Sequence, residues 1–101
     1  MKIYISGAIS GTTDFMDRFA KAEKELTENG YSVINPAKVN AQLPEDTTYE
    51  EYMKMCFCML DMCDSICMLK GWEKSCGANR ELGYAMAKKK AVFYNHKLMH
   101  E

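Results

Sequence analysis

Four short apolar runs alternate with stretches of helical periodicity, and this alternation leaves few folds open to the chain. The runs cover residues 2–6, 31–34, 65–69 and 91–94. Helical patterns begin near Asp14, Thr48 and Cys76. Strands and helices that alternate at this spacing form parallel βαβ units with right-handed crossovers. We therefore predict an α/β fold, a flavodoxin-like three-layer sandwich with a short parallel sheet of about four strands. The general rule for such sheets suggests the order 2-1-3-4, with the switch point between strands one and three.

The helix boundaries are also marked in the sequence. Asn29–Gly30 ends the first helix, and Thr48 with Glu51 has the spacing of a capping box for the second. Residues 37–46 are polar and contain Pro44, so we expect an irregular loop there. The inward residues predicted for the second helix are Tyr49, Tyr52, Met53, Cys56 and Leu60. Those predicted for the third, which runs from about residue 76 to 88, are Ala78, Leu82, Ala85 and Met86.

Length and composition indicate one ordinary globular domain spanning residues 1–101. Of the 101 residues, 48% are hydrophobic and 27% are charged, and the formal net charge is −1. Such a charge gives no overall attraction to a nucleic acid polymer or a membrane surface. No apolar run approaches the ~20 residues of a membrane span, and the first strand is too short for a signal peptide. We therefore expect a cytoplasmic protein with neither kind of partner.

Five cysteines are crowded into the segment 56–76, at positions 56, 58, 63, 67 and 76. Residues on opposite faces of one element cannot all pair, which argues against a disulfide framework. His96 and His100 lie far from this cluster, so the spacing is not that of a zinc site. We expect reduced thiols that behave as small apolar groups, and no metal or other cofactor.

Two glycine-containing loops are expected to meet at one edge of the sheet. Residues 7–13 follow the first strand, and residues 70–77 follow the third. Each loop opens a helix, and helix N-termini that face a cleft suit a phosphate or a sugar oxygen. The first loop is not a dinucleotide or P-loop pattern, so a simple tight turn remains an equal alternative.

Glu81 lies about one turn into the third helix, at the edge of its predicted buried stripe. A glutamate there suits the helix dipole even without a catalytic role. Tyr4 is, by default, a core tyrosine whose hydroxyl finds a partner. Trp72 is either a packed lid or a platform on which a ring stacks.

The sequence resembles the nucleoside 2-deoxyribosyltransferase superfamily, and within it a small uncharacterised family, a domain of unknown function. The resemblance rests on Ile5–Ser6–Gly7 and on Gly-Trp-Glu-Lys-Ser-Cys-Gly-Ala at residues 71–78, and it extends from Tyr4 to about Tyr94. In the superfamily, a glutamate on the third helix attacks the anomeric carbon. Glu81 stands at the matching spacing, six residues after Ser75 and four after Gly77.

This resemblance implies a set of site residues. Glu81 would be the nucleophile and Tyr4 the residue that positions it. Substrate contacts would come from Gly7, Ile9, Ser10, Gly11, Thr12, Cys56, Trp72, Ser75, Cys76 and Gly77. Active members carry an aspartate eight residues before the one that opens the third strand, and counting back from Asp64 gives Cys56. A thiol cannot relay protons as a carboxylate does, so this position departs from the pattern.

The resemblance implies an enzyme, a nucleoside 2-deoxyribosyltransferase or an N-glycosidase acting on deoxynucleosides or their 5′-monophosphates. The alternative is a nucleotide-binding module of the same fold without turnover, which Cys56 favours. A partner-binding protein with a relic cleft is a third reading, against which Tyr4, Ser75, Gly77 and Glu81 argue together. Superfamily members close the cleft with a second subunit, so we also expect a homo-oligomer.

Overall fold

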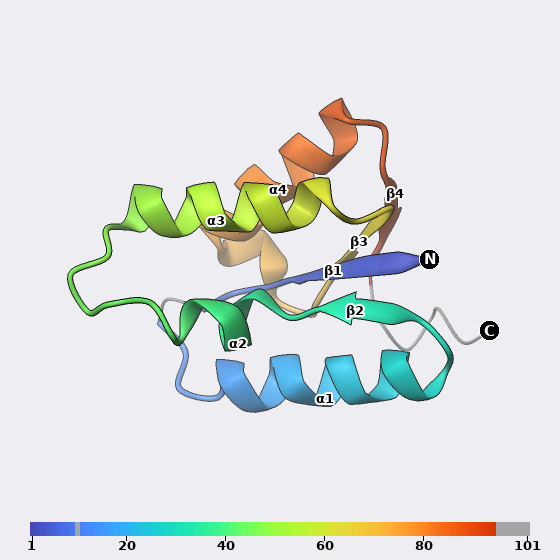
Figure 1. Ribbon diagram of the computed structural model, residues 1–101, viewed down its shortest axis with the longest axis horizontal. Helices are drawn as coiled ribbons and strands as arrows, with labels where there is room; N and C mark the ends of the chain where they lie inside the picture. The colour runs from blue at the N-terminus through green and yellow to red at the C-terminus, as the bar shows by residue number, and fades with distance from the viewer. Residues whose placement is uncertain (10, 95–101) are drawn as a thin grey trace.

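The protein is a four-stranded parallel sheet with helices on both faces (Figure 1). The computed structural model describes residues 1–9 and 11–94. Its strands are β1 (Lys2–Ser6), β2 (Ser32–Ile34), β3 (Ser65–Met68) and β4 (Ala91–Phe93). Their order, β2-β1-β3-β4, confirms the predicted order 2-1-3-4, and every pairing is parallel.

Helix α1 (Phe15–Glu28) covers one face of the sheet, and α3 (Tyr49–Asp61) and α4 (Cys76–Ala87) cover the other (Figure 1). Each face has its own core, because successive side chains of β1 point to opposite sides. Ile3 and Ile5 pack with Phe19 of α1, whereas Tyr4 packs with Leu60 of α3 and with α4. All four residues of β3 are buried, as expected for a strand covered on both faces.

Two short elements complete the fold. The 3₁₀ helix η1 (Trp72–Lys74) lies between β3 and α4, and α2 (Pro36–Asn40) follows β2. The expectation of an irregular loop over residues 37–46 was wrong at its start. Asn35 caps α2, since its side chain accepts hydrogen bonds from the N–H groups of Ala37 and Lys38. Pro36 occupies the first helical turn, where a missing N–H costs nothing.

The capping box predicted at the start of α3 is present, with reciprocal hydrogen bonds between Thr48 and Glu51. Two predicted inward residues face solvent instead: Tyr49 is 47% exposed and Met86 is 60% exposed. Glu81, and not Met86, completes the buried face of α4. No helix in the described ranges has the length and apolar character that a membrane span requires.

Candidate functional site

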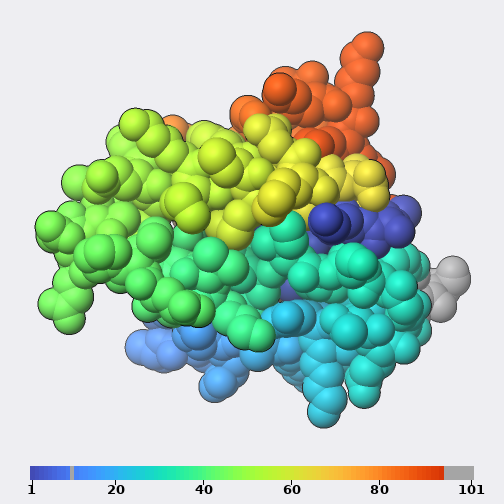
Figure 2. Space-filling view, viewed as in Figure 1, coloured from blue at the N-terminus to red at the C-terminus, as the bar shows by residue number. Residues whose placement is uncertain are grey.

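A cavity of ≈ 610 Å³ lies where the segment after β1 meets α2 and the N-terminal parts of α1, α3 and α4. Its volume falls within the range of small-molecule sites. β1 and β2 point toward this end of the molecule, which is the left side of Figure 1. Figure 2 shows the green segment between α2 and α3 projecting at the same end. The cavity therefore occupies the edge of the sheet where α/β proteins bind ligands.

Glu81 lies in the wall of this cavity and is only 6% exposed. The hydroxyl of Tyr4 donates a hydrogen bond to Oε2 of Glu81, which is the contact that the superfamily resemblance implied. The hydroxyl of Ser6 donates to Oε1 at 2.7 Å. Both donors come from β1, where residues two apart share a face. Ser6 was missed in the sequence, although the period of two counted from Tyr4 was a signal that could have found it.

Burial and hydrogen bonding act on Glu81 in opposite directions. Burial, the larger effect, raises the pKa of the Glu81 carboxyl, while hydrogen bonds from Tyr4, Ser6 and Cys56 lower it. The pKa of Tyr4 lies well above its usual range, first because the phenol is buried and second because the negative charge of Glu81 is adjacent. Tyr4 therefore keeps its proton and serves as a permanent donor to the carboxylate.

Cys56 and Asn40 form a second polar group in the cavity wall. Burial, followed by the charge of Glu81, raises the pKa of the Cys56 thiol to about 11. Nδ2 of Asn40 donates to the Cys56 sulfur at 3.4 Å. Oδ1 of Asn40 is buried and has no hydrogen-bond partner among the described residues. Asn40 was absent from the sequence prediction because its helix was expected to be a loop.

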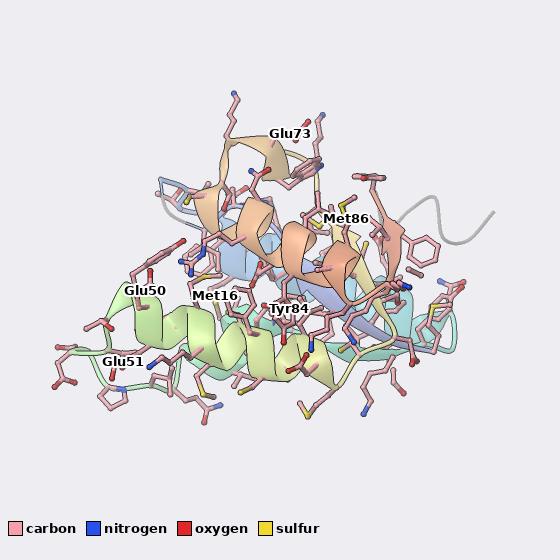
Figure 3. The ribbon with its side chains drawn as sticks, turned by 90° about the horizontal axis from the view of Figure 1, so that it is seen from above. Met16, Glu50, Glu51, Glu73, Tyr84 and Met86 are labelled. Carbon is pink, nitrogen blue, oxygen red and sulfur yellow. The ribbon has the colours of Figure 1, made fainter. Side chains whose placement is uncertain are left out.

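Most of the remaining wall is apolar or aromatic: Ile9, Phe15, Met16, Ala37, Ala41, Tyr49, Tyr52, Met53 and Ala78. Tyr49 is held from outside the cavity by Arg80, whose guanidinium lies 5.6 Å from the ring centroid. Arg80 also makes a bidentate ion pair with Glu50. Glu50 occupies the first turn of α3, at the N-terminal end of the helix (Figure 3). This contact joins the start of α3 to α4 beside the cavity.

Ser75 and Gly77 bring the start of α4 into the cavity wall. Ser75 is the N-cap, and its hydroxyl accepts from the N–H of Ala78 at 3.1 Å. The first N–H groups of any helix lack partners inside the helix, so they suit an anionic or oxygen-rich ligand group.

The structure brings together some predicted site residues and separates others. Gly7, Ile9, Cys56, Ser75, Gly77 and Glu81 line the cavity, and Tyr4 lies directly behind Glu81. Gly11, Thr12, Trp72 and Cys76 do not line it. Ser10 lies outside the described residues, as do His96 and His100.

Each displaced residue has a local reason. Trp72 packs against Tyr94, with ring centroids 5.9 Å apart, so it covers the core and not the cavity. Thr12 closes a turn, since its hydroxyl donates to the carbonyl of Ile9. Gly11 has a φ of 81°, a conformation that favours glycine in such a turn. Cys76 is exposed on α4.

The five cysteines are all free thiols. Within residues 1–9 and 11–94, no group of three or more His, Cys, Asp or Glu side chains is arranged to hold a metal ion.

Comparison with known proteins agrees with the fold described above. A family model described as "Domain of unknown function (DUF4406)" matches residues 1–94. A search of curated proteins by sequence found no significant match. Among solved structures, the chain resembles the 2-deoxyribosyltransferase from the psychrotolerant bacterium Bacillus psychrosaccharolyticus, described as a biocatalyst for the synthesis of nucleosides.

That similarity has a TM-score of 0.74 at 22% sequence identity, and it covers 91% of this chain and 69% of the other. At this sequence identity the structural similarity establishes only the fold. The match to the family model establishes that the chain is a member of that family. The chain therefore belongs to the DUF4406 family and has the α/β fold of a 2-deoxyribosyltransferase.

Proposed function

We propose that this protein cleaves the N-glycosidic bond of deoxynucleosides or their 5′-monophosphates, with Glu81 as the nucleophile. The reaction is either 2-deoxyribosyl transfer or hydrolysis. One observation carries the proposal: a buried carboxylate lies at a ligand-sized cavity and both of its oxygens are oriented by hydroxyl donors of β1.

In this mechanism, one oxygen of Glu81 attacks C1′ of the sugar and the base departs. Glycosidic cleavage passes through an oxocarbenium-like state that a carboxylate beneath the ring stabilises. Tyr4 and Ser6 hold the carboxylate at fixed orientation, so little reorganisation is needed at the moment of attack. Water or a second base then takes the sugar from Glu81.

The start of α4 is suited to the other end of the substrate. Ser75 and the N–H groups of the first turn would hold the 5′ oxygen or a 5′-phosphate. Gly7 and Ile9 would contact the nucleoside from the side of β1, since both line the same cavity.

A non-catalytic nucleotide-binding module is the second candidate, and Cys56 favours it. A thiol with a pKa of about 11 stands beside Glu81. It holds its proton at neutral pH, so it is a poor acid for a departing base.

A panel of deoxynucleosides and 5′-monophosphates, incubated with and without a second free base, separates these functions. Chromatography should show released base, and a new nucleoside only if transfer occurs. Glu81→Gln should lose release, whereas Glu73→Gln, at an exposed position on η1, should not. Calorimetric binding without release would favour the binding module. Neither binding nor release would contradict both.

We also propose a homo-oligomer. Exposed apolar side chains of Ile9, Met16, Val39 and Tyr49 lie on the elements around the cavity. Covering them would remove apolar surface from water. Light scattering at micromolar concentration should show more than one copy, and a monomer would contradict this.

A further inference from the structure

The charge inside the cavity is unusual for a nucleotide site. Among the cavity residues that the structure describes, Glu81 alone carries a charged side chain, and none is lysine, arginine or histidine. A carboxylate in a largely apolar site attracts a cation strongly, because little water screens it. The aromatic rings of Phe15 and Tyr52 also line the cavity, and ring faces attract cations. Tyr49 adds less, since Arg80 already contacts its ring.

Two side chains of the cavity wall that could act as acids are poorly suited to the leaving group. A neutral base must gain a proton as its glycosidic bond breaks, and an effective donor has a pKa near the working pH. The pKa of Cys56 is about 11, and burial raises the pKa of Tyr49. Glu81 cannot supply the proton while it attacks C1′. Cys56 and Tyr49 are therefore poorly matched to protonating a base that departs at neutral pH.

We propose that the substrates are N-glycosides whose base is already a cation, such as a pyridinium nucleoside or an N7-alkylated purine nucleoside. This inference rests on the proposed role of Glu81. A bond forms between a carboxylate oxygen of Glu81 and C1′, and the electron pair of the C1′–N bond moves to the cationic ring nitrogen. The base leaves neutral, and no proton is needed. Water then attacks C1′, the electron pair of the ester bond returns to Glu81, and one proton enters solvent.

Asn40 indicates which cationic nucleosides the cavity would prefer. Its Oδ1 is buried, unpartnered among the described residues, and belongs to a cavity residue, while Nδ2 is engaged by Cys56. The free oxygen can only accept a hydrogen bond. That oxygen is not accessible from the cavity as the side chain stands. A base that carries an N–H donor, as in a ring carboxamide or an exocyclic amine, would satisfy it once the Asn40 side chain turns the oxygen toward the cavity. A cationic base with such a group matches both features of the cavity.

Matched nucleosides test the proposal in the wild-type protein. N7-methyl-2′-deoxyguanosine is compared with 2′-deoxyguanosine, and the 2′-deoxyribosyl nucleoside of pyridine-3-carboxamide serves as a second cation. Because cationic nucleosides lose their base spontaneously, the rate with Glu81→Gln is subtracted. We expect Glu81-dependent release from both cations to be about 10²-fold faster than from 2′-deoxyguanosine, which is the scale of acid catalysis. Equal rates would overturn this inference and leave the proposed function standing. No Glu81-dependent release from any of the three would overturn both.

Cys56→Asp sharpens the test, because it places a potential acid beside Glu81. Release from 2′-deoxyguanosine at saturating substrate should rise about 10-fold or more, and by a larger factor than release from the cations. Cys58→Asp, at an exposed position on the same helix, is the matched control and should leave both rates unchanged. Equal gains on neutral and cationic nucleosides would contradict the proposal. If Cys56→Asp does not fold, the wild-type comparison still decides.

Discussion

The floor and the rim of the cavity are built in different ways. The floor is Glu81 with Tyr4 and Ser6 directly behind it, and these three residues, from β1 and α4, are at most 6% exposed. Side-chain hydrogen bonds connect all three. The rim comes from the segment after β1, from α2 and from the start of α3. Its side chains include Ile9 and Tyr49, which are 36% and 47% exposed.

This difference separates chemistry from recognition. A nucleophile needs a fixed orientation, and regular elements packed in a core provide one. Groups that select a ligand lie more often on short or irregular segments, which change without disturbing the core. Changes at the floor should therefore affect the reaction most, while changes at the rim should affect binding or local stability. Four substitutions test this contrast, in order of expected effect.

Glu81→Gln should have the largest effect. The amide keeps the shape of the side chain but cannot attack carbon, so base release should fall about 10³-fold or more while ligand binding persists. Release rates and calorimetric affinities measured on the same preparation check this. The exposed Glu73→Gln should behave as wild type. Equal rates of base release by wild type and Glu81→Gln would mean that Glu81 is not the nucleophile.

Tyr4→Phe should lower release about 10- to 100-fold, because the carboxylate loses one of the donors that orient it. The hydrogen bond from Tyr4 lowers the pKa of Glu81, so its loss should raise that pKa further. Glu81 must be ionised to attack, so activity is lost as pH falls through its pKa. The acidic limb of the pH–rate profile should therefore move to higher pH.

Tyr84→Phe is the matched control for this pH shift. The hydroxyl of Tyr84 donates to Asp61 at 2.7 Å, and the ring lies between α3 and α4 (Figure 3). Removing that hydroxyl leaves the floor intact, so the acidic limb should stay where it is. An unshifted pH–rate profile in Tyr4→Phe would show that the Tyr4 hydroxyl does not lower the pKa of Glu81.

Ser75→Ala should weaken ligand binding by about 1–2 kcal/mol with a smaller effect on the chemical step. The same change removes the N-cap of α4 and should lower the free energy of unfolding by about 1 kcal/mol. Calorimetry and denaturant unfolding measure the two effects separately. A loss of turnover with unchanged affinity would mean that Ser75 acts in the chemical step and not in ligand binding.

Thr48→Ala should have the smallest effect on function. It removes the capping box of α3 and should cost about 1 kcal/mol of stability, visible as a lower Tm. Thr27→Ala, at an exposed position in α1, should leave Tm nearly unchanged. Release of base should remain close to wild type, because neither residue lines the cavity. A large loss of release in Thr48→Ala would mean that the start of α3 takes part in the reaction.

The same contrast governs what could be read from the sequence. Tyr4 and Glu81 were predicted to meet because the resemblance to the superfamily implied it and because strands one and three were expected to be neighbours, and the structure contains this contact. The rim was predicted less well. Asn40 was missed, and Trp72 was expected over the ligand but packs against Tyr94. Asn40 and Trp72 lie on helices of five and three residues, which are too short to show a periodicity that predicts where a side chain points. Their contacts therefore depend on which partner lies nearby.

By itself, the sequence determined the four strands, the major helices and the parallel sheet. These follow from local hydrophobic periodicity, capping residues and the handedness of βαβ units. Only the tertiary structure decided that α2 forms part of the cavity wall and that Oδ1 of Asn40 has no hydrogen-bond partner among the described residues. It also decided that Glu81 is the only charged side chain among the described residues that line the cavity. Those properties arise from segments distant in the chain, and burial and charge at one point depend on all of them together.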